Sequence, residues 1–141
     1  MIDLIKGFES FSEIAYLCPA GYWTYGYGSR YKLDGTPVKQ GDTITRQAAE
    51  ALLNDYLIKN VHPLFRQIPY SLTQNQKDAI CSLVFNVGKN GFINSKLFKA
   101  IKEKDYENIC RQWDWFKCNG KVVKGLVVRR VKELYLFIKD I

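Results

Sequence analysis

The sequence predicts an α+β fold in which a short helix and a small antiparallel sheet precede a bundle of helices. Three observations support this prediction. Residues 14–38 are rich in Tyr, Trp, Thr and Gly, which is typical of strands and tight turns. The stretches that follow Thr45 and Thr73 repeat apolar residues at spacings of three and four, as amphipathic helices do. The length of 141 residues suits a single domain with its own core.

The N-terminal residues predict a short helix that ends beside a carboxylate. We expect Asp3 to cap this helix and residues 7–9 to form its last turn, so that Glu9 lies where helix gives way to loop. Within the strand-rich stretch, Asp34 and Gly35 form a dipeptide that is typical of hairpin turns.

Capping residues mark the starts of the helices that follow. We expect N-caps at four positions, the second of which forms a capping box with Gln76: Thr45, Thr73, Ser95 and Asp105. The helix that opens at Thr45 runs to about residue 60, which is long enough to link two lobes.

The last helix is expected after Gly125, and its sequence predicts which side faces inward. The apolar residues expected to pack inward are Leu126, Val127, Val131, Leu134, Tyr135 and Ile138. The charged residues expected to be more exposed are Arg130, Lys132 and Glu133.

The charge is unevenly distributed along the chain. The net charge is +7; residues 1–60 carry a net −1 and residues 61–141 a net +8. Such a basic half attracts polyanions, among them nucleic acid, anionic membranes and the acidic bacterial wall. Charge alone does not choose among these partners.

The composition argues against several classes of protein. The chain has no apolar run of about 18 residues, and its first residues lack the parts of a secretory signal. The four cysteines form no CxxC pair, so a zinc site is not expected. A disulfide between Cys110 and Cys118 is conceivable only in an oxidising compartment.

Three residues of the N-terminal part are candidates for a catalytic site: Glu9, then Cys18, then Thr24. This order, with Gly7-Phe8-Glu9 and Trp23-Thr24-Tyr25-Gly26-Tyr27-Gly28, resembles the phage-type lysozymes, glycoside hydrolase family 24. Three later segments are similar to that family as well: Gln76-Lys77-Asp78-Ala79, Phe85-Asn86-Val87-Gly88 and Gly125-Leu126-Val127-Val128-Arg129-Arg130. Two positions depart from its common pattern: many relatives have Asp where Cys18 stands, and often His where Ser29 stands.

The resemblance implies a lysozyme-like fold and a lytic activity. The expected fold is one domain over residues 1–141, with a sheet lobe at about 13–40 and a helical lobe at about 61–141. The helical lobe is expected to include the N-terminal helix and to be joined to the sheet lobe by the long helix. The expected activity is that of a muramidase, which cleaves the β-1,4 bond between N-acetylmuramic acid and N-acetylglucosamine as an endolysin in host lysis.

The resemblance also assigns roles to individual residues. Glu9 is the expected proton donor, and Thr24 is expected to orient a water molecule. Cys18 acts either as the base in an inverting reaction, with acid and base about 6.5–9.5 Å apart, or as a nucleophile in a retaining one. Arg129, rather than Arg130, is expected to pair with Glu9. The residues expected to support the site or bind substrate are Tyr25, Tyr27, Gln76 and Asn86; about half of the aromatic residues of this segment should pack inward.

No cofactor or metal is expected. The expected partner is the glycan strand of peptidoglycan, and the protein is expected to be a monomer. Neither binding to nucleic acid nor stable insertion into a membrane is expected. The resemblance implies that the enzyme waits in the host cytoplasm until a holin gives access to the wall. Three alternatives remain: a peptidase that uses Cys18 with the single histidine His62, a basic nucleic-acid-binding module, and a wall-binding domain without activity.

Overall fold

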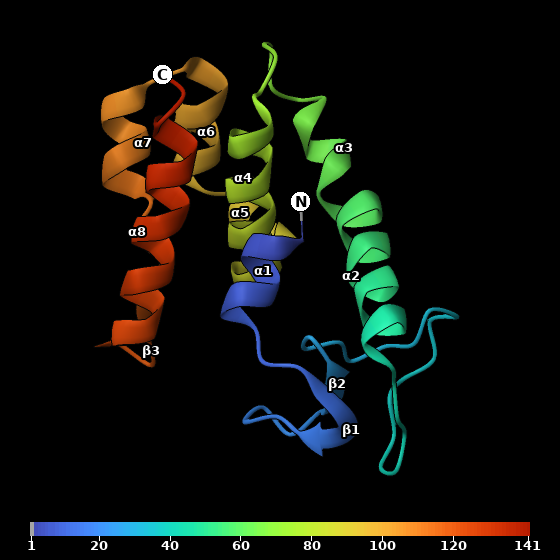
Figure 1. Ribbon diagram of the computed structural model, residues 1–141. Helices are drawn as coiled ribbons and strands as arrows, with labels where there is room; N and C mark the ends of the chain where they lie inside the picture. The colour runs from blue at the N-terminus through green and yellow to red at the C-terminus, as the bar shows by residue number, and fades with distance from the viewer. Residues whose placement is uncertain (1) are drawn as a thin grey trace. The chain divides into compact units, whose positions relative to one another are not determined.

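The computed structural model describes residues 2–141, which form two compact units (Figure 1). Ile2–Lys59 form the first, called here the sheet unit, and Asn60–Ile141 form the second, called the helical unit. The mixture of helices and small antiparallel sheets confirms the predicted α+β class. The prediction that all 141 residues form a single domain stays a prediction.

The sheet unit contains two helices and two strands: α1 (Asp3–Phe8), β1 (Ser12–Leu17), β2 (Trp23–Gly26) and α2 (Arg46–Asn60). β1 and β2 pair antiparallel, with Tyr16 opposite Thr24 and Leu17 opposite Trp23, which confirms the small antiparallel sheet. By its contacts α1 lies in this unit, where Lys6 forms an ion pair with Glu50, whereas the sequence grouped the N-terminal helix with the helical lobe.

The start of α1 differs from its prediction. Ile2 occupies the N-cap position, where it makes no side-chain capping bond, so the expectation that Asp3 caps the helix was wrong. The helix begins one residue earlier than expected, and this places Asp3 inside the first turn. A carboxylate there still complements the positive end of the helix dipole. The predicted end holds, because Glu9 is the C-cap and its N–H donates to the Ile5 carbonyl at 2.8 Å.

The core of the sheet unit lies between the strands and α2. Its buried centre contains Ala15, Tyr25 and Val38, and partly buried Trp23, Ile44 and Leu52 pack against it. Gly26 allows the strand to approach α2 closely, because a Cβ at this position would lie 3.0 Å from the Cβ of Ala49. Its φ of +62° is also one that residues with a side chain rarely adopt.

The helical unit consists of six helices and one small hairpin within residues 60–141. In chain order these elements are α3 (His62–Phe65), α4 (Gln74–Val87), α5 (Lys89–Ile93), α6 (Lys96–Glu103), α7 (Tyr106–Gln112), β3 (Lys117–Cys118), β4 (Lys121–Val122) and α8 (Lys124–Ile138). α4 packs against α8, and α6 packs against α7. The β3–β4 hairpin, which the sequence did not predict, turns through Asn119 and Gly120, both with positive φ, as a tight Asn-Gly turn requires.

All four predicted N-caps are confirmed by hydrogen bonds. Each side-chain oxygen accepts from the backbone N–H of the third residue of its helix: Thr45 from Ala48, Thr73 from Gln76, Ser95 from Phe98 and Asp105 from Asn108. The capping box of Thr73 and Gln76 is complete, because the Gln76 side chain in turn accepts from the Thr73 N–H at 3.0 Å.

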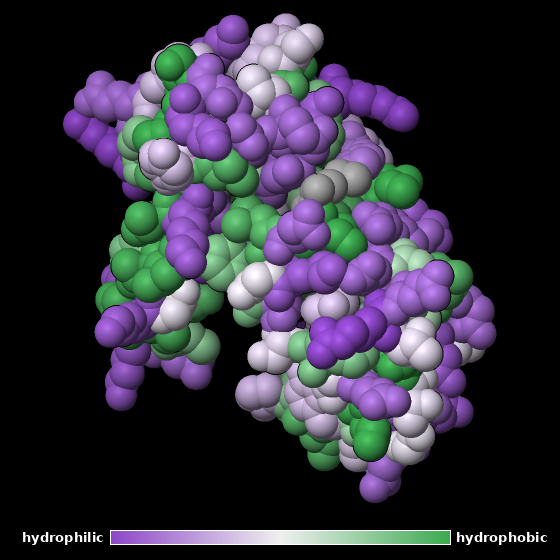
Figure 2. All heavy atoms as spheres, viewed as in Figure 1, coloured by the Kyte–Doolittle hydropathy of each residue, from purple (hydrophilic) through white to green (hydrophobic). Residues whose placement is uncertain are grey.

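The predicted inward face of α8 was wrong in part. Val131 and Tyr135 are 61% and 65% exposed, whereas Arg130 and Glu133 are only 1% and 0% exposed. Lys132 is exposed as predicted, and Leu126, Val127, Leu134 and Ile138 are half-buried. Figure 2 shows hydrophobic surface gathered over the hairpin and the N-terminal half of α8. The helix buries charged groups because they neutralise one another, a compensation that hydrophobic periodicity does not record.

Two further findings concern the described residues. None of their helices is both long and apolar enough to cross a bilayer. Among residues 2–141, no three His, Cys, Asp or Glu side chains are grouped so that they could hold a metal ion.

Candidate active site

A tight turn between β1 and β2 holds Cys18. The Gly21 N–H donates to the Cys18 carbonyl at 2.8 Å, and the Cys18 N–H donates to the Tyr22 carbonyl at 3.0 Å. Pro19 follows Cys18, and Gly21 has a φ of +84°, which is the pattern of a three-residue hairpin loop that closes with a glycine in the left-handed region. The loop sequence thus fixes the backbone on both sides of the thiol.

The surroundings of the Cys18 thiol favour its ionised form. The Tyr22 backbone N–H lowers the pKa of this thiol, and the Ala20 N–H, the Thr24 hydroxyl and the charge of Arg30 act in the same direction. Partial burial opposes them, yet the net pKa lies below the ordinary value for cysteine. Donors aimed at sulfur are what a thiol needs to act as a base or nucleophile near neutral pH.

Thr24 lies beside Cys18. Thr24 is 3% exposed, and its hydroxyl donates to the Tyr22 carbonyl at 3.0 Å and lies close enough to the Cys18 thiol to lower its pKa. A hydroxyl has one proton to donate, so the carbonyl and an ionised sulfur compete for it. The structure therefore joins two of the three residues that the sequence singled out, through one shared network.

Glu9 enters the same unit from the end of α1. Its backbone is fixed by the hydrogen bond from its N–H to the Ile5 carbonyl, and the residue is half-buried. The placement at a helix end agrees with the prediction. Its position across a sugar-sized gap from Cys18 and Thr24 stays a prediction.

The aromatic residues of this segment divide between core and surface. Tyr25 and Tyr27 are 6% and 3% exposed, and the Tyr27 ring lies 5.4 Å from that of Phe11. Tyr22 and Tyr31 are exposed, which agrees with the expectation that about half pack inward. Tyr25, in β2, and Tyr27, directly after it, are both covered and pack within the sheet unit. A direct contact of either residue with substrate stays a prediction.

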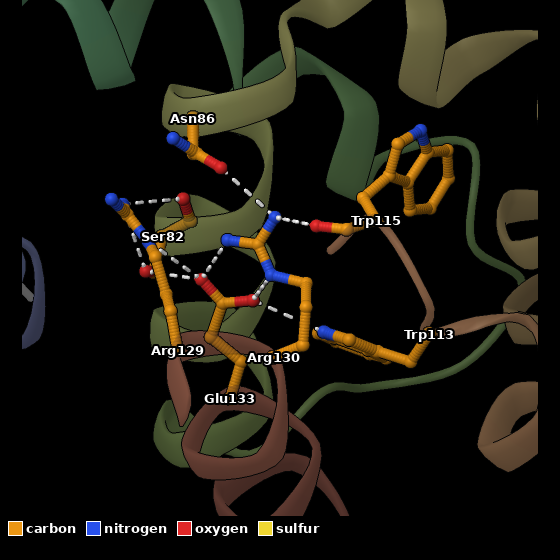
Figure 3. Close-up of polar contacts among 7 residues, drawn as sticks. All are labelled: Ser82, Asn86, Trp113, Trp115, Arg129, Arg130 and Glu133. Carbon is orange, nitrogen blue, oxygen red and sulfur yellow. Dashed lines mark hydrogen bonds and ion pairs between the residues drawn. The ribbon is translucent and has the colours of Figure 1, made fainter. Parts of the chain in front are cut away.

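The helical unit holds a buried ion cluster centred on Glu133 (Figure 3). The Glu133 carboxylate accepts from the Ser82 hydroxyl at 2.6 Å, from Trp113 Nε1 at 3.1 Å and from Arg129 Nε at 3.1 Å. Arg130 holds the same carboxylate with two nitrogens, Nη2 to Oε1 at 2.8 Å and Nε to Oε2 at 2.7 Å. The expectation that Arg130 and Glu133 face solvent was therefore wrong.

The cluster compensates most of the polar groups that it buries, although within residues 2–141 Arg130 Nε makes only an ion-pair contact with Glu133 and no hydrogen bond. Two guanidinium groups share one carboxylate, and a carboxylate taken out of water is tolerated only when it is paired and fully hydrogen-bonded. Neutral partners complete the network: Arg129 Nη2 donates to the Ser82 carbonyl at 3.1 Å, and Arg130 Nη1 donates to the Trp115 carbonyl at 3.3 Å. The ion pair between Arg129 and Glu9 that the sequence suggested stays a prediction.

The last two predicted site residues both lie on α4. Gln76 is 7% exposed, and its side chain belongs to the capping box, which gives it a structural task. Asn86 is exposed, and its Oδ1 accepts from Arg130 Nη1 at 3.0 Å. The sequence identified Asn86 but missed Ser82, Trp113 and Glu133. The signal for Glu133 was present, because Arg129 and Arg130 precede it by the four- and three-residue spacings of helical ion pairs.

The other cysteines differ from Cys18 in their surroundings. Cys81 is buried in α4, and this burial raises the pKa of its thiol to about 12. Cys110 and Cys118 are exposed, and both are free thiols. Cys18 therefore combines partial exposure with a lowered pKa, whereas Cys81 is a small apolar residue of the core.

Known proteins resemble the chain over nearly its whole length. The phage lysozyme family model matches residues 6–133. An endolysin of Acyrthosiphon pisum secondary endosymbiont phage 1 is 42% identical over 139 residues, which cover 95% of this chain and 92% of that endolysin.

Two solved structures are similar to the chain as well. The endolysin from Escherichia coli O157:H7 phage FAHEc1 has a TM-score of 0.86 and 31% identity, and the similarity covers 99% of this chain and 91% of that one. The crystal structure of a P22 lysozyme mutant has a TM-score of 0.81 and 34% identity, covering 97% of this chain and 94% of that one. The similarity thus extends over both units.

Proposed function

The chain belongs to the phage lysozyme family, and from this premise we propose that it is a muramidase acting as an endolysin in host lysis. Its substrate is the glycan strand of peptidoglycan, and the bond cleaved is the β-1,4 bond between N-acetylmuramic acid and N-acetylglucosamine. The observation that carries the proposal is the family match, because its matched residues include Glu9 and the Cys18–Thr24 pair.

We assign the acid step to Glu9. When the bond between the anomeric carbon and the bridging oxygen breaks, the departing oxygen needs a proton, and a carboxyl group at the end of a rigid helix can deliver it. The proton passes from Glu9 to the bridging oxygen, and the glycan fragment that carries this oxygen leaves as an alcohol. Positive charge that develops at the anomeric carbon is then quenched by water.

We assign the water to Cys18 and Thr24. In its ionised form Cys18 accepts a proton from water while the water oxygen bonds to the anomeric carbon from the face opposite Glu9. The Thr24 hydroxyl orients that water. Transfer of the proton from the thiol to solvent, and of one from solvent to Glu9, restores both groups. The lowered pKa of the Cys18 thiol supports this role, since more of it is ionised near neutral pH.

The contact between Thr24 and Cys18 favours the base route over the nucleophile route. If the sulfur attacked the sugar, the Thr24 hydroxyl would serve only to stabilise the ionised thiol and would have no water to orient in that step. If the Cys18 thiol and the Thr24 hydroxyl bind one water, their proximity places both groups within reach of it. We therefore propose an inverting reaction.

We propose that the basic helical unit keeps the enzyme at the anionic wall. Residues 60–141 carry a net charge of +8, and long-range attraction of this kind weakens as salt is added. Lysis should therefore slow as ionic strength rises. We also propose a monomer that stays in the host cytoplasm until a holin opens the membrane.

The test is digestion of purified peptidoglycan by the native chain and by Glu9→Gln. The native enzyme should release fragments with N-acetylmuramic acid at the reducing end, and Glu9→Gln should lower the rate by about 10²-fold or more, since general acid catalysis contributes on that order. Glu13→Gln is the matched control, because Glu13 is an exposed residue of β1 and its amide variant should keep the native rate.

The alternatives give different outcomes. A Cys–His peptidase would release new amino termini without new reducing ends, and Glu9→Gln would not slow it. A nucleic-acid-binding or wall-binding module would release neither. Each of these outcomes would overturn the proposed function.

A further inference from the structure

We infer that Arg130 is a positioning residue, which holds Asn86 with its amide N–H₂ group outward to donate to a carbonyl oxygen of the peptidoglycan. This inference rests on the proposed function and deepens it by one specific contact. It joins the buried ion cluster, which the proposed chemistry leaves without a task, to an exposed side chain at the end of α4.

The orientation of the Asn86 amide is fixed by the chemistry of its neighbour. The guanidinium group of Arg130 carries donors and no acceptor, so only the amide oxygen can face it. Oδ1 lies 3.0 Å from Nη1, and Figure 3 shows the amide nitrogen on the side away from the guanidinium. A flipped amide would bring two sets of N–H protons together, so the donor side of Asn86 faces outward.

Arg130 is itself held in place on both sides of its guanidinium group. Its guanidinium is held by Glu133 at two nitrogens, with N···O distances of 2.8 and 2.7 Å, and by the Trp115 carbonyl at 3.3 Å. Exposed asparagines usually rotate freely and lose that freedom when they bind. Because the hydrogen bond from Arg130 already restricts the Asn86 side chain, less freedom is lost on binding, which is what preorganisation means for a ligand contact.

The outward group selects the chemistry of its ligand. A neutral N–H₂ group donates hydrogen bonds and cannot neutralise charge, so its natural acceptor is a carbonyl oxygen rather than a carboxylate. Peptidoglycan offers two sources of amide carbonyls, the N-acetyl groups of its sugars and the peptide bonds of its stems. The same hydrogen bond would serve either source.

Asn86→Asp separates the two functions of the side chain. The carboxylate still accepts from Arg130 but has no N–H to offer, so the melting temperature should not fall. KM for peptidoglycan should rise about fivefold, the value of one ordinary hydrogen bond, with kcat within about twofold of native. Asn86→Leu should raise KM equally without adding charge. The charge-matched control is Asn119→Asp in the β3–β4 turn, which should keep the native KM.

Arg130→Lys tests the positioning role. Lysine keeps one positive charge but lacks the fork that holds Glu133 and Asn86 together. KM should rise although Asn86 is intact, and the double variant Arg130→Lys/Asn86→Asp should have the KM of Asn86→Asp alone. If the cluster is merely structural, Arg130→Lys will lower the melting temperature and leave KM unchanged, which would overturn the inference.

Three substrates identify the carbonyl: intact peptidoglycan, strands freed of stem peptides by an amidase, and N-deacetylated strands. A KM penalty for Asn86→Asp that disappears on one of the two modified substrates supports the inference and names the source. An equal penalty on all three, or none on intact peptidoglycan, overturns it. The proposed function fails separately, if the native chain releases no reducing ends.

Discussion

The Cys18–Thr24 turn and the Glu133 cluster are both polar networks, but they are assembled in opposite ways. The turn joins neighbours in sequence through backbone hydrogen bonds, and its thiol is half-exposed. The cluster joins α4, the segment after α7 and α8, across separations of 20 to 51 residues, and it is buried. Local chemistry can be inferred from a sequence, whereas a buried ion cluster depends on which helices pack together.

The same difference predicts where the molecule is fragile. Removing a half-exposed thiol from a turn leaves the backbone bonds intact. Removing the shared carboxylate of two buried guanidinium groups leaves positive charges without compensation, and this costs far more. Substitutions in the turn should therefore lower activity more than stability, and substitutions in the cluster should lower stability more than activity.

Glu133→Ala should have the largest effect on stability. We expect a loss of about 3–5 kcal/mol in the free energy of unfolding, because a buried pair is broken by removing one partner. Denaturant unfolding followed by tryptophan fluorescence measures it, and Trp113 loses its acceptor in the same variant.

The matched control for this variant is Glu107→Ala. Glu107 pairs with Arg111 on α7, but their side chains are 71% and 68% exposed. An exposed pair of this spacing is worth about 0.3–0.5 kcal/mol. Equal losses for the two variants would erase the contrast between the cluster and an ordinary surface pair.

Cys18→Ala should have the largest effect on activity after Glu9→Gln. We expect kcat to fall by about 10²-fold, the lower end of what a positioned base contributes, with little change in melting temperature. Cys110→Ala, which removes an exposed thiol of α7, should change neither. A large fall in stability for Cys18→Ala would show that the turn depends on the side chain as well as on its backbone bonds.

The pH profile gives a second measure of the Cys18 thiol. A base works only when deprotonated, so the native rate should fall as pH decreases through the lowered pKa of Cys18. Cys18→Asp should move this acid limb towards about pH 4, the ordinary range of Asp. If the native enzyme and Cys18→Asp lose activity at the same acidic pH, the group that titrates there is not residue 18.

Gly26→Ala should have a smaller effect, within the sheet unit. The new Cβ would lie 3.0 Å from that of Ala49, at a φ of +62°, so we expect a loss of about 1–3 kcal/mol from backbone strain and contact together. Gly35→Ala isolates the backbone part, because its φ is +85° and no atom lies within 4 Å of the new Cβ. Thermal unfolding measures the loss of stability in both variants. Equal losses would show that the contact with Ala49 adds nothing to the backbone strain.

The predictions from sequence succeeded where structure is decided by neighbours. Thr45, Thr73, Ser95 and Asp105 cap helices as expected, since a capping bond spans only three residues. The Asp34–Gly35 dipeptide forms a turn, with the Gly35 N–H donating to the Lys32 carbonyl at 2.9 Å. Cys18 likewise lies in a turn between strands.

The predictions failed where distant partners decide. Periodicity places Val131 and Tyr135 inward because it weighs each residue by its own hydropathy. Glu133 is buried instead, because Ser82, Trp113 and two arginines bind its carboxylate. Ser82 and Trp113 lie outside α8, so the sequence of this helix alone does not reveal their contacts. For the same reason the sequence identified Asn86 as a site residue without revealing that Arg130 orients it.

The central claim is that the Cys18 thiol and the Thr24 hydroxyl share one water and deliver it opposite Glu9. The direct test is the anomeric configuration of the new reducing ends, measured by ¹H NMR in the first minutes of digestion, before mutarotation. The account predicts α-N-acetylmuramic acid, the inverted product of a β-linked bond. Initial formation of the β-anomer would contradict it, because retention requires two successive displacements at the anomeric carbon rather than one direct attack by water.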